Sequence, residues 1–240
     1  MAEVKNEKAK LSAKEKLHKF GERFFEIEDD NHLSGYEVFY IFMICNVIGY
    51  CVEMVWCFLK NGYWESRQSL VFGPFGLAYG LGGIVLSYIL HKDIDRPWWY
   101  IFIKSWFWGS VSEYISSLGE EIVFGHVSWD YSHMPLNING RVCFLYSLFW
   151  GVLGLVWCKL IYPSFIKFIH KIPIKPGKII FWILFLFMLV DIVLSAEAVN
   201  RYNQRHDGVP ASNKVDVFLD EHFTDEFLQK VYANAMEVDK

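Results

Sequence analysis

The apolar residues of this chain are gathered into runs of about twenty between Tyr36 and Val199, with short polar segments between the runs. Soluble domains break their apolar residues into shorter stripes, whereas a helix that crosses a bilayer needs about 20 consecutive, mostly apolar residues. The 240 residues are 53% hydrophobic and only 21% charged, in agreement with this pattern. It excludes a soluble globular enzyme, a disordered chain and a disulfide scaffold, and it predicts a multi-pass membrane protein.

We therefore expect an all-α fold, a polytopic membrane bundle of about five transmembrane helices over residues 36–199. An N-terminal arm, 1–35, precedes the bundle and a short polar C-terminal tail, 200–240, follows it. Each predicted span is long enough to cross about 30 Å of hydrocarbon at about 1.5 Å per residue. The spans are 36–59, 71–90, 98–123, 142–162 and 179–199.

The N-terminal arm carries the pattern of an amphipathic helix. Ser12 followed by Glu15 matches a capping box, and apolar residues follow at helical spacing from Leu17 to Ile27. Such a helix is expected to lie on the inner membrane surface or to pack on the bundle. In the tail, the spacing of Leu219, Phe223 and Phe227 indicates one or two small helices.

The distribution of lysine and arginine gives the orientation. Basic residues are concentrated in the arm and in the segments between spans two and three and between spans four and five. Cytoplasmic loops carry such an excess, so the N-terminus is predicted to be cytoplasmic and the C-terminus extracytoplasmic. The net charge of −4 gives no case for nucleic-acid binding, and the expected surroundings are the lipid bilayer.

Polar residues inside the spans are costly and usually face a bundle interior or an aqueous cavity. The third span holds a stripe at spacings of three or four, made by Ser105, Gly109, Ser112, Ser116 and Glu120. Glu113 lies at the edge of this stripe, Glu53 lies in the first span and Asp191 in the fifth, one turn before Ser195. These carboxylates are candidates for substrate or ion binding or for a proton relay. Alternatively, they only join neighbouring helices through hydrogen bonds.

The second span is rich in glycine, at Gly73, Gly76, Gly80 and Gly83, next to Pro74. Small residues at this spacing allow two helices to approach closely. Alternatively, a span interrupted by glycine and proline can expose backbone groups to a substrate, as in transporters. The sequence leaves both interpretations open.

The outer loops add further candidate site residues, because loops that carry tryptophan, acid, amide and arginine together suit binding. The candidates are Arg67, Trp129, Asp130, Tyr131, Asn137 and Arg141. Arg141 is expected to organise the site, since Asp130 precedes it in the same loop and Glu120 ends the preceding span. The histidines and acids of this loop do not indicate a metal site. The five cysteines lie in apolar stretches without a CxxC pair, so we expect small buried side chains and no cofactor.

These residues together resemble the family of membrane proteins described as "Putative ABC-transporter type IV". The resemblance covers most of 36–201 and is most specific from Trp129 to Arg141. It rests on an acidic first span, Arg67, Gly73-Pro74, Tyr79-Gly80, Glu113, Glu120, Trp129-Asp130-Tyr131-Ser132, Pro135, Asn137 and Gly140-Arg141. It implies a permease-like subunit of the bacterial plasma (inner) membrane. The sequence departs from the family pattern at Leu77, where proline is frequent.

Three classes of function remain open. The first is a transporter or permease component, which would need a separate cytoplasmic ATPase because the chain has no G-x-x-x-x-G-K-[ST] motif. The second is an intramembrane enzyme at the outer leaflet, with acid–base groups drawn from Glu120, Glu121, His126, Asp130 and His133. The third is a non-transporting membrane partner or sensor. The substrate and any homo-oligomeric state cannot be read from the sequence.

Overall fold

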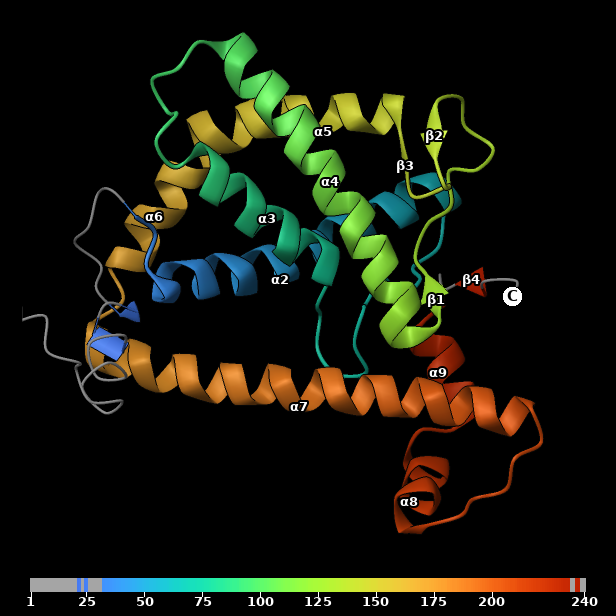
Figure 1. Cartoon of the computed structure of the whole chain (residues 1–240). Helices are drawn as coiled ribbons and strands as arrows, with labels where there is room; N and C mark the ends of the chain where they lie inside the picture. The colour runs from blue at the N-terminus through green and yellow to red at the C-terminus, as the bar shows by residue number, and fades with distance from the viewer. Residues whose placement is uncertain (1–20, 23, 26–31, 234–235, 238–240) are drawn as a thin grey trace, which may run out of the picture.

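The computed structural model describes residues 21–22, 24–25, 32–233 and 236–237, and these are mostly helical (Figure 1). The main helices are α2 (Gly35–Asn61), α3 (Leu77–Leu90), α4 (Trp98–Phe124), α5 (Phe144–Val156) and α7 (Ile174–His206). A π-helical turn, Trp157–Ile161, joins α5 to α6 (Tyr162–His170), and the tail forms α8 (Lys214–His222) and α9 (Asp225–Val231). Two-residue strands, β1 (His126–Val127), β2 (Asn137–Ile138), β3 (Val142–Cys143) and β4 (Met236–Glu237), form the pairs β1–β4 and β2–β3.

Three helices of the described chain are long and apolar enough to cross a membrane, namely Gly35–Asn61, Phe144–His170 and Ile174–His206. Their outward faces carry large exposed apolar side chains, such as Ile183 and Leu186 on α7. Lipid is the solvent that suits such faces. The predicted helical membrane protein is therefore confirmed. The count of five crossings remains a prediction, because α3 is short and α4 carries several charged residues.

Each predicted span overlaps one of the helices α2, α3, α4, α5 and α7, and the largest difference at the start of a helix is at the second span. There, helix α3 begins at Leu77 and not at Val71, so the predicted start was wrong by six residues. Gly73 and Pro74 explain the difference, because Gly73 has φ of +74° and proline removes a backbone donor. The fourth span continues beyond residue 162 to His170 through the π-helical turn.

Residues 62–76 form a non-helical segment between α2 and α3, which we call the returning segment. It leaves the end of α2 and comes back along the bundle, as Figure 1 shows in teal, until the N–H of Gly76 donates to the carbonyl of Asn46 over 3.1 Å. Asn46 lies near the middle of α2. The hydroxyl of Ser69 accepts from the N–H of Leu77 over 3.2 Å and so caps α3. The second predicted span is therefore interrupted by non-helical backbone, as one of the two interpretations of its glycine pattern proposed.

Glycines also bring α2 and α3 into close contact, so the close-packing interpretation of the glycine pattern holds within helix α3 itself. A Cβ atom added at Gly83 would lie 2.5 Å from Sγ of Cys45, and one added at Gly80 would lie 2.7 Å from the ring of Phe42. Any larger residue would push the helices apart. Gly80 and Gly83 therefore serve packing, whereas Gly73 and Gly76 precede the helix.

The predicted polar stripe of α4 faces protein. Its members are buried: Ser105 at 0%, Ser112 at 6% and Ser116 at 7% exposure, with Gly109 also buried. Helix α5 covers the stripe, because the side chain of Trp150 packs on Gly109 and Ser105 fits against Gly154. Small residues on both helices permit this approach.

The tail is folded against the end of α7. Val71 of the returning segment packs in one apolar cluster with Val199 of α7 and with Leu219, Phe223 and Leu228 of the tail. Arg201 pairs with Asp220 through two contacts of 2.9 Å. The hydrogen bonds from Arg201, and then from Arg205, lower the pKa of the Asp220 carboxyl to about 2. The small helices predicted for the tail are confirmed.

The other end of α2 begins with a capping box made by Ser34 and Glu37. The box predicted at Ser12 and Glu15 lies outside the described residues, as does most of the amphipathic arm. Of the five cysteines, four are buried, but Cys51 is exposed. The burial predicted for Cys51 was wrong, because this residue shares the outward face of α2 with Val52 and Val55.

Candidate functional site

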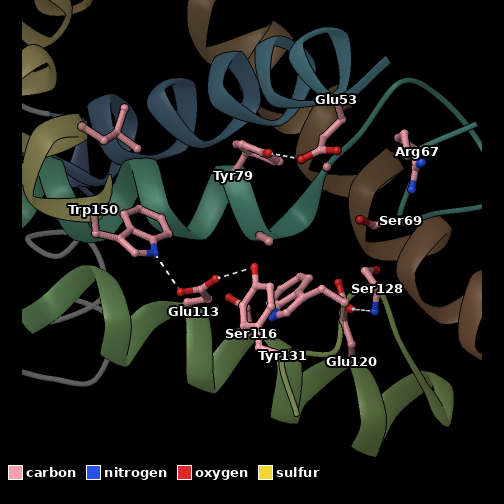
Figure 2. Close-up of a pocket in the computed structure, with 14 residues that line it drawn as sticks. Glu53, Arg67, Ser69, Tyr79, Glu113, Ser116, Glu120, Ser128, Tyr131 and Trp150 are labelled. Atoms are coloured by element: carbon pink, nitrogen blue, oxygen red, sulfur yellow. Dashed lines mark hydrogen bonds between the residues drawn. The ribbon is translucent and has the colours of Figure 1, made fainter. Parts of the chain in front are cut away.

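A cavity of about 260 Å³ lies between α2, α3, α4 and α5, close to the ends of α2 and α4 (Figure 2). The returning segment and the loop 125–143 complete its walls. The lining residues are Glu53, Arg67, Ser69, Gly76, Ala78, Tyr79, Glu113, Ser116, Glu120, Ser128, Trp129, Tyr131, Trp150 and Leu153. Three carboxylates and four aromatic rings therefore meet around one small space.

Glu113 projects from α4 and is held from two sides. The indole Nε1–H of Trp150 donates to Oε2 over 3.0 Å, and the hydroxyl of Tyr131 donates to Oε1 over 3.1 Å. Figure 2 shows both bonds meeting at the carboxylate, one from α5 and one from the loop. Each oxygen thus has one neutral donor, which fixes the orientation of the carboxylate without neutralising its charge.

Glu120 lies two turns further along α4 and is 7% exposed. Its Oε2 accepts the backbone N–H of Ser128 over 3.0 Å. This contact depends on Gly125, which ends α4 with φ of +72° and directs the chain back over the cavity. The turn after α4 therefore sets the position of the carboxylate and of the loop together.

Glu53 joins α2 to α3, because the hydroxyl of Tyr79 donates to its Oε1. Gly49, one turn earlier on α2, leaves the space that the ring of Tyr79 fills. In Figure 2 this pair lies across the cavity from Glu113. The first and third predicted spans thus face each other through their carboxylates.

Arg67 is the one basic residue among the described residues that line the cavity. Its guanidinium pairs with Glu65 over 2.9 Å and donates to Sγ of Cys57 over 3.4 Å. The charge of Arg67 is therefore offset by a carboxylate outside the lining. Among these groups Cys57 acts as a hydrogen-bond acceptor, in addition to being a small buried side chain.

The loop 125–143 presents Trp129 and Tyr131 to the cavity but not Asp130, which lies between them. Asp130 accepts the N–H of Ser132 over 2.8 Å and its hydroxyl over 2.7 Å, and these bonds lower the pKa of the Asp130 carboxyl. Asn137 bridges the loop, since its amide donates to the Met134 carbonyl and accepts from Gly140 N–H. Asp130 and Asn137 therefore shape the loop from outside the cavity.

Arg141 also lies outside the cavity lining. Its guanidinium pairs with Glu121 and donates to Ser117 over 3.1 Å, and its carbonyl accepts the indole N–H of Trp129 over 2.9 Å. The acidic partner of Arg141 is therefore Glu121 of α4, and not Glu120 or Asp130, the two acids near which the sequence places it. Arg141 positions Trp129 and ties the loop to α4.

Asp191 is buried in α7 at 1% exposure, on the far side of the returning segment from the cavity. Its Oδ1 accepts the N–H of Phe72 over 3.2 Å, and Ser195 accepts the N–H of Val71 over 2.9 Å. The two side chains replace the backbone partners that a helix would give these donors. Asp191 is thus an anchor for the returning segment.

Six of the ten predicted site residues line one cavity: Glu53, Arg67, Glu113, Glu120, Trp129 and Tyr131. Sequence reasoning did not assign Tyr79, Ser128 or Trp150 to the site. Trp150 had a usable signal, since it lies inside a span and away from the membrane interfaces that tryptophan favours. Ser128 acts through its backbone, and nothing in the sequence indicates this role.

The described residues contain no group of three or more His, Cys, Asp or Glu side chains arranged to hold a metal ion. The polar cavity is built instead from separate carboxylates, each with its own neutral donor. Such a site can bind a polar solute or exchange protons.

Long apolar helices around buried polar groups define a helical membrane protein with a transporter-like character. The chain belongs to the family described as "Putative ABC-transporter type IV", whose model matches residues 40–196, well over half of the sequence. The predicted resemblance is confirmed, and the matched residues include all ten predicted site residues, from Glu53 to Asp191. No curated protein and no solved structure matches this chain.

Proposed function

We propose that the protein is the permease-like membrane component of a transporter and that the cavity is its solute site. One observation carries the proposal: residues from α2, the returning segment, α4 and the loop 125–143, far apart in sequence, converge on one polar cavity among apolar helices. Intramembrane polar groups gathered in this way mark solute or ion pathways. Membership of an ABC-transporter-type family supports the same class.

The returning segment gives the site its second transporter-like feature. Non-helical backbone at membrane depth is tolerated where it is buried in protein or lines a cavity. Here Ser69 and Gly76 line the cavity on one side of the segment, while Asp191 and Ser195 hold its other side. The segment can therefore form a wall of a solute site without exposing its backbone to lipid.

The proposed arrangement has five crossings, with the N-terminus inside and the tail outside. In this arrangement the cavity opens in the outer half of the membrane, because it lies near the last residues of α2 and α4. An ATPase subunit would dock at the opposite end. Helix α6, with Phe168 57% exposed beside Lys167, is a candidate contact there.

The enzyme alternative finds less support in the geometry. Glu120 accepts from Ser128, Glu121 pairs with Arg141, and Asp130 is engaged with Ser132. The ring of His126 packs against Tyr232 of the tail, and burial lowers the pKa of this histidine. These acid–base groups therefore face four different partners and not one reaction centre.

Purification of the tagged protein from its native membranes in mild detergent tests the proposal. A transporter component should copurify with a nucleotide-binding subunit and with ATP hydrolysis that the membrane subunit alone lacks. A control preparation that carries Lys167→Glu and Phe168→Ser should lose this partner if α6 is the contact. Recovery of the intact protein without any ATPase, under conditions that preserve other such complexes, would contradict an ATP-driven permease.

A further inference from the structure

We propose that the cavity selects a small organic cation, an amine or a quaternary ammonium group. The inference rests on the proposed function, because it names the class of solute for the same cavity. Its basis is the charge and the wall chemistry of the lining residues, taken with their hydrogen-bond partners.

The carboxylates outnumber the cations at the cavity. Glu53, Glu113 and Glu120 line it, and Arg67 is the one basic side chain among the described lining residues. Arg67 is already paired with Glu65, which lies outside the lining. The ion pair with Glu65 therefore offsets most of the positive charge of Arg67 before a solute binds. The three lining carboxylates then leave the cavity with an excess of negative charge.

The hydrogen bonds to these carboxylates do not remove that excess. Glu53 accepts from a tyrosine hydroxyl, Glu113 from a hydroxyl and an indole N–H, and Glu120 from a backbone N–H. All four donors are neutral. A buried negative charge without a counter-charge is costly, so a positively charged solute would complete the site.

The walls favour an organic cation over a bare metal ion. Trp129, Tyr131, Tyr79 and Trp150 bring four aromatic rings to the lining, and Leu153 and Ala78 add apolar surface. Aromatic faces attract alkylammonium groups and are a recurring feature of quaternary-ammonium sites. Hard metal ions such as Ca²⁺ prefer six to eight oxygen ligands, and rings do not supply these.

The size of the cavity agrees with such a solute. About 260 Å³ leaves room for a group of several heavy atoms beside the carboxylates. Two sources share this chemistry, namely a free amine in solution and the ammonium headgroup of a lipid. The experiment below separates them.

Isothermal titration of the full-length protein in nanodiscs made only of phosphatidylglycerol tests the inference. The probe is choline, and the matched control is 3,3-dimethyl-1-butanol, which has the same shape without the charge. Choline should bind, and the neutral alcohol should bind at least tenfold more weakly. Acetate, as an anionic probe, should show no binding.

Two variants assign the binding to the cavity. Glu113→Gln removes one lining charge and should weaken choline binding at least tenfold. Glu197→Gln removes the same charge from an exposed position on α7 outside the cavity and should leave choline binding unchanged. If Glu113→Gln is unstable, Trp150→Leu tests the same site through the aromatic wall and should weaken binding by a similar factor.

Nanodiscs that contain phosphatidylcholine distinguish the two sources. A headgroup that enters the cavity should reduce the apparent affinity for free choline, whereas a site for free amines should be unaffected. Equal binding of choline and the neutral alcohol, preference for acetate, or absence of choline binding would each overturn the cation inference. The ATPase copurification test is independent, so the permease proposal can survive that failure.

Discussion

The backbone N–H of Phe72 donates to the carboxylate of Asp191, which lies 119 positions further along the chain. The bond joins the returning segment to the middle of α7, and Ser195 adds a second bond to Val71 next to it. Because the other side of the segment lines the cavity, α7 supports the site without touching it. The fifth helix therefore has a structural role in a site formed by the other four.

Replacement of Asp191 tests this support. Asp191→Leu should lower the free energy of unfolding by about 1–3 kcal/mol, because Phe72 N–H loses its acceptor inside the bundle. Asp191→Asn retains an oxygen acceptor and should cost less. Thermal unfolding of the two variants in one detergent measures the difference, and equal Tm values for leucine and asparagine would contradict the anchor.

Replacement of Glu113 separates binding from packing. Glu113→Gln should keep the fold, because the amide oxygen can accept from Trp150 while its NH₂ donates to the Tyr131 hydroxyl. Glu113→Leu leaves both partners unpaired and should destabilise by about 1–3 kcal/mol for each. The glutamine variant should nevertheless lose transport. A stable glutamine variant with wild-type uptake would make Glu113 a structural residue.

Arg141 is expected to affect the cavity indirectly, because it holds the loop 125–143 against α4. Arg141→Ala should loosen the loop 125–143, because the ties to Glu121 and Ser117 are lost while Trp129 keeps only a backbone acceptor. Arg141→Lys should restore little, since an ammonium cannot reproduce a forked contact to two partners. Limited proteolysis within the loop provides the measurement. Cleavage of the alanine variant at the wild-type rate would remove Arg141 from this role.

The five-crossing arrangement predicts which positions meet the outer solution. A cysteine introduced at Ser212, in a cysteine-free background, should react with an impermeant maleimide on intact cells. One introduced at Ala9 should react only after permeabilisation. The native Cys51 must be removed first, because it is exposed. Protection of position 212 in intact cells would require an even number of crossings.

The tail should detach in acid. Asp220 has its pKa lowered to about 2, below its usual value of 3.8, by the hydrogen bonds from Arg201 and then Arg205. A folded-state pKa below the unfolded one stabilises the docked tail above about pH 4, and this contribution is lost as the pH falls toward 2. The protection of the α8 amides against hydrogen exchange, relative to the unfolded chain at the same pH, should therefore fall over that interval.

Asp220→Asn provides the matched test at neutral pH. This variant should show, near pH 6, the reduced protection of the α8 amides that the wild type shows only in acid. Asp207→Asn, at the exposed end of α7, is the control and should exchange like the wild type. Unchanged protection of α8 in Asp220→Asn would show that apolar contacts alone hold the tail.

The sequence predicted the helical membrane class and most helix positions because continuous apolar runs of about twenty residues are long enough to be distinguished from strands and from the helices of soluble proteins. It also placed Glu113 and Glu120 near one face of the third span, since seven positions correspond to about two turns of a helix. These conclusions depend only on local patterns.

The parts that the sequence did not predict depend on contacts between distant segments. Arg141 contacts Glu121 and not its neighbour Glu120 because of the way in which α4 ends at Gly125. A sequence pattern does not distinguish between two adjacent acids. Ser128 contacts Glu120 through its backbone N–H, a donor that nearly every residue has, so the identity of the residue gives no signal. Trp150 reaches Glu113 from another helix, and its partner could be identified only once α4 and α5 were packed together.

The unequal lengths of two helices have a mechanical consequence. At about 1.5 Å per residue, the 33 residues of α7 extend about 50 Å, whereas the 14 residues of α3 extend about 21 Å, less than the hydrocarbon layer. In the five-crossing arrangement the remainder of that crossing consists of residues 62–76, which lack a helix's internal bonds. A change in bilayer thickness would therefore compress or stretch this crossing first, while α7 stays stiff. The compliant part of the molecule is also the wall of its cavity.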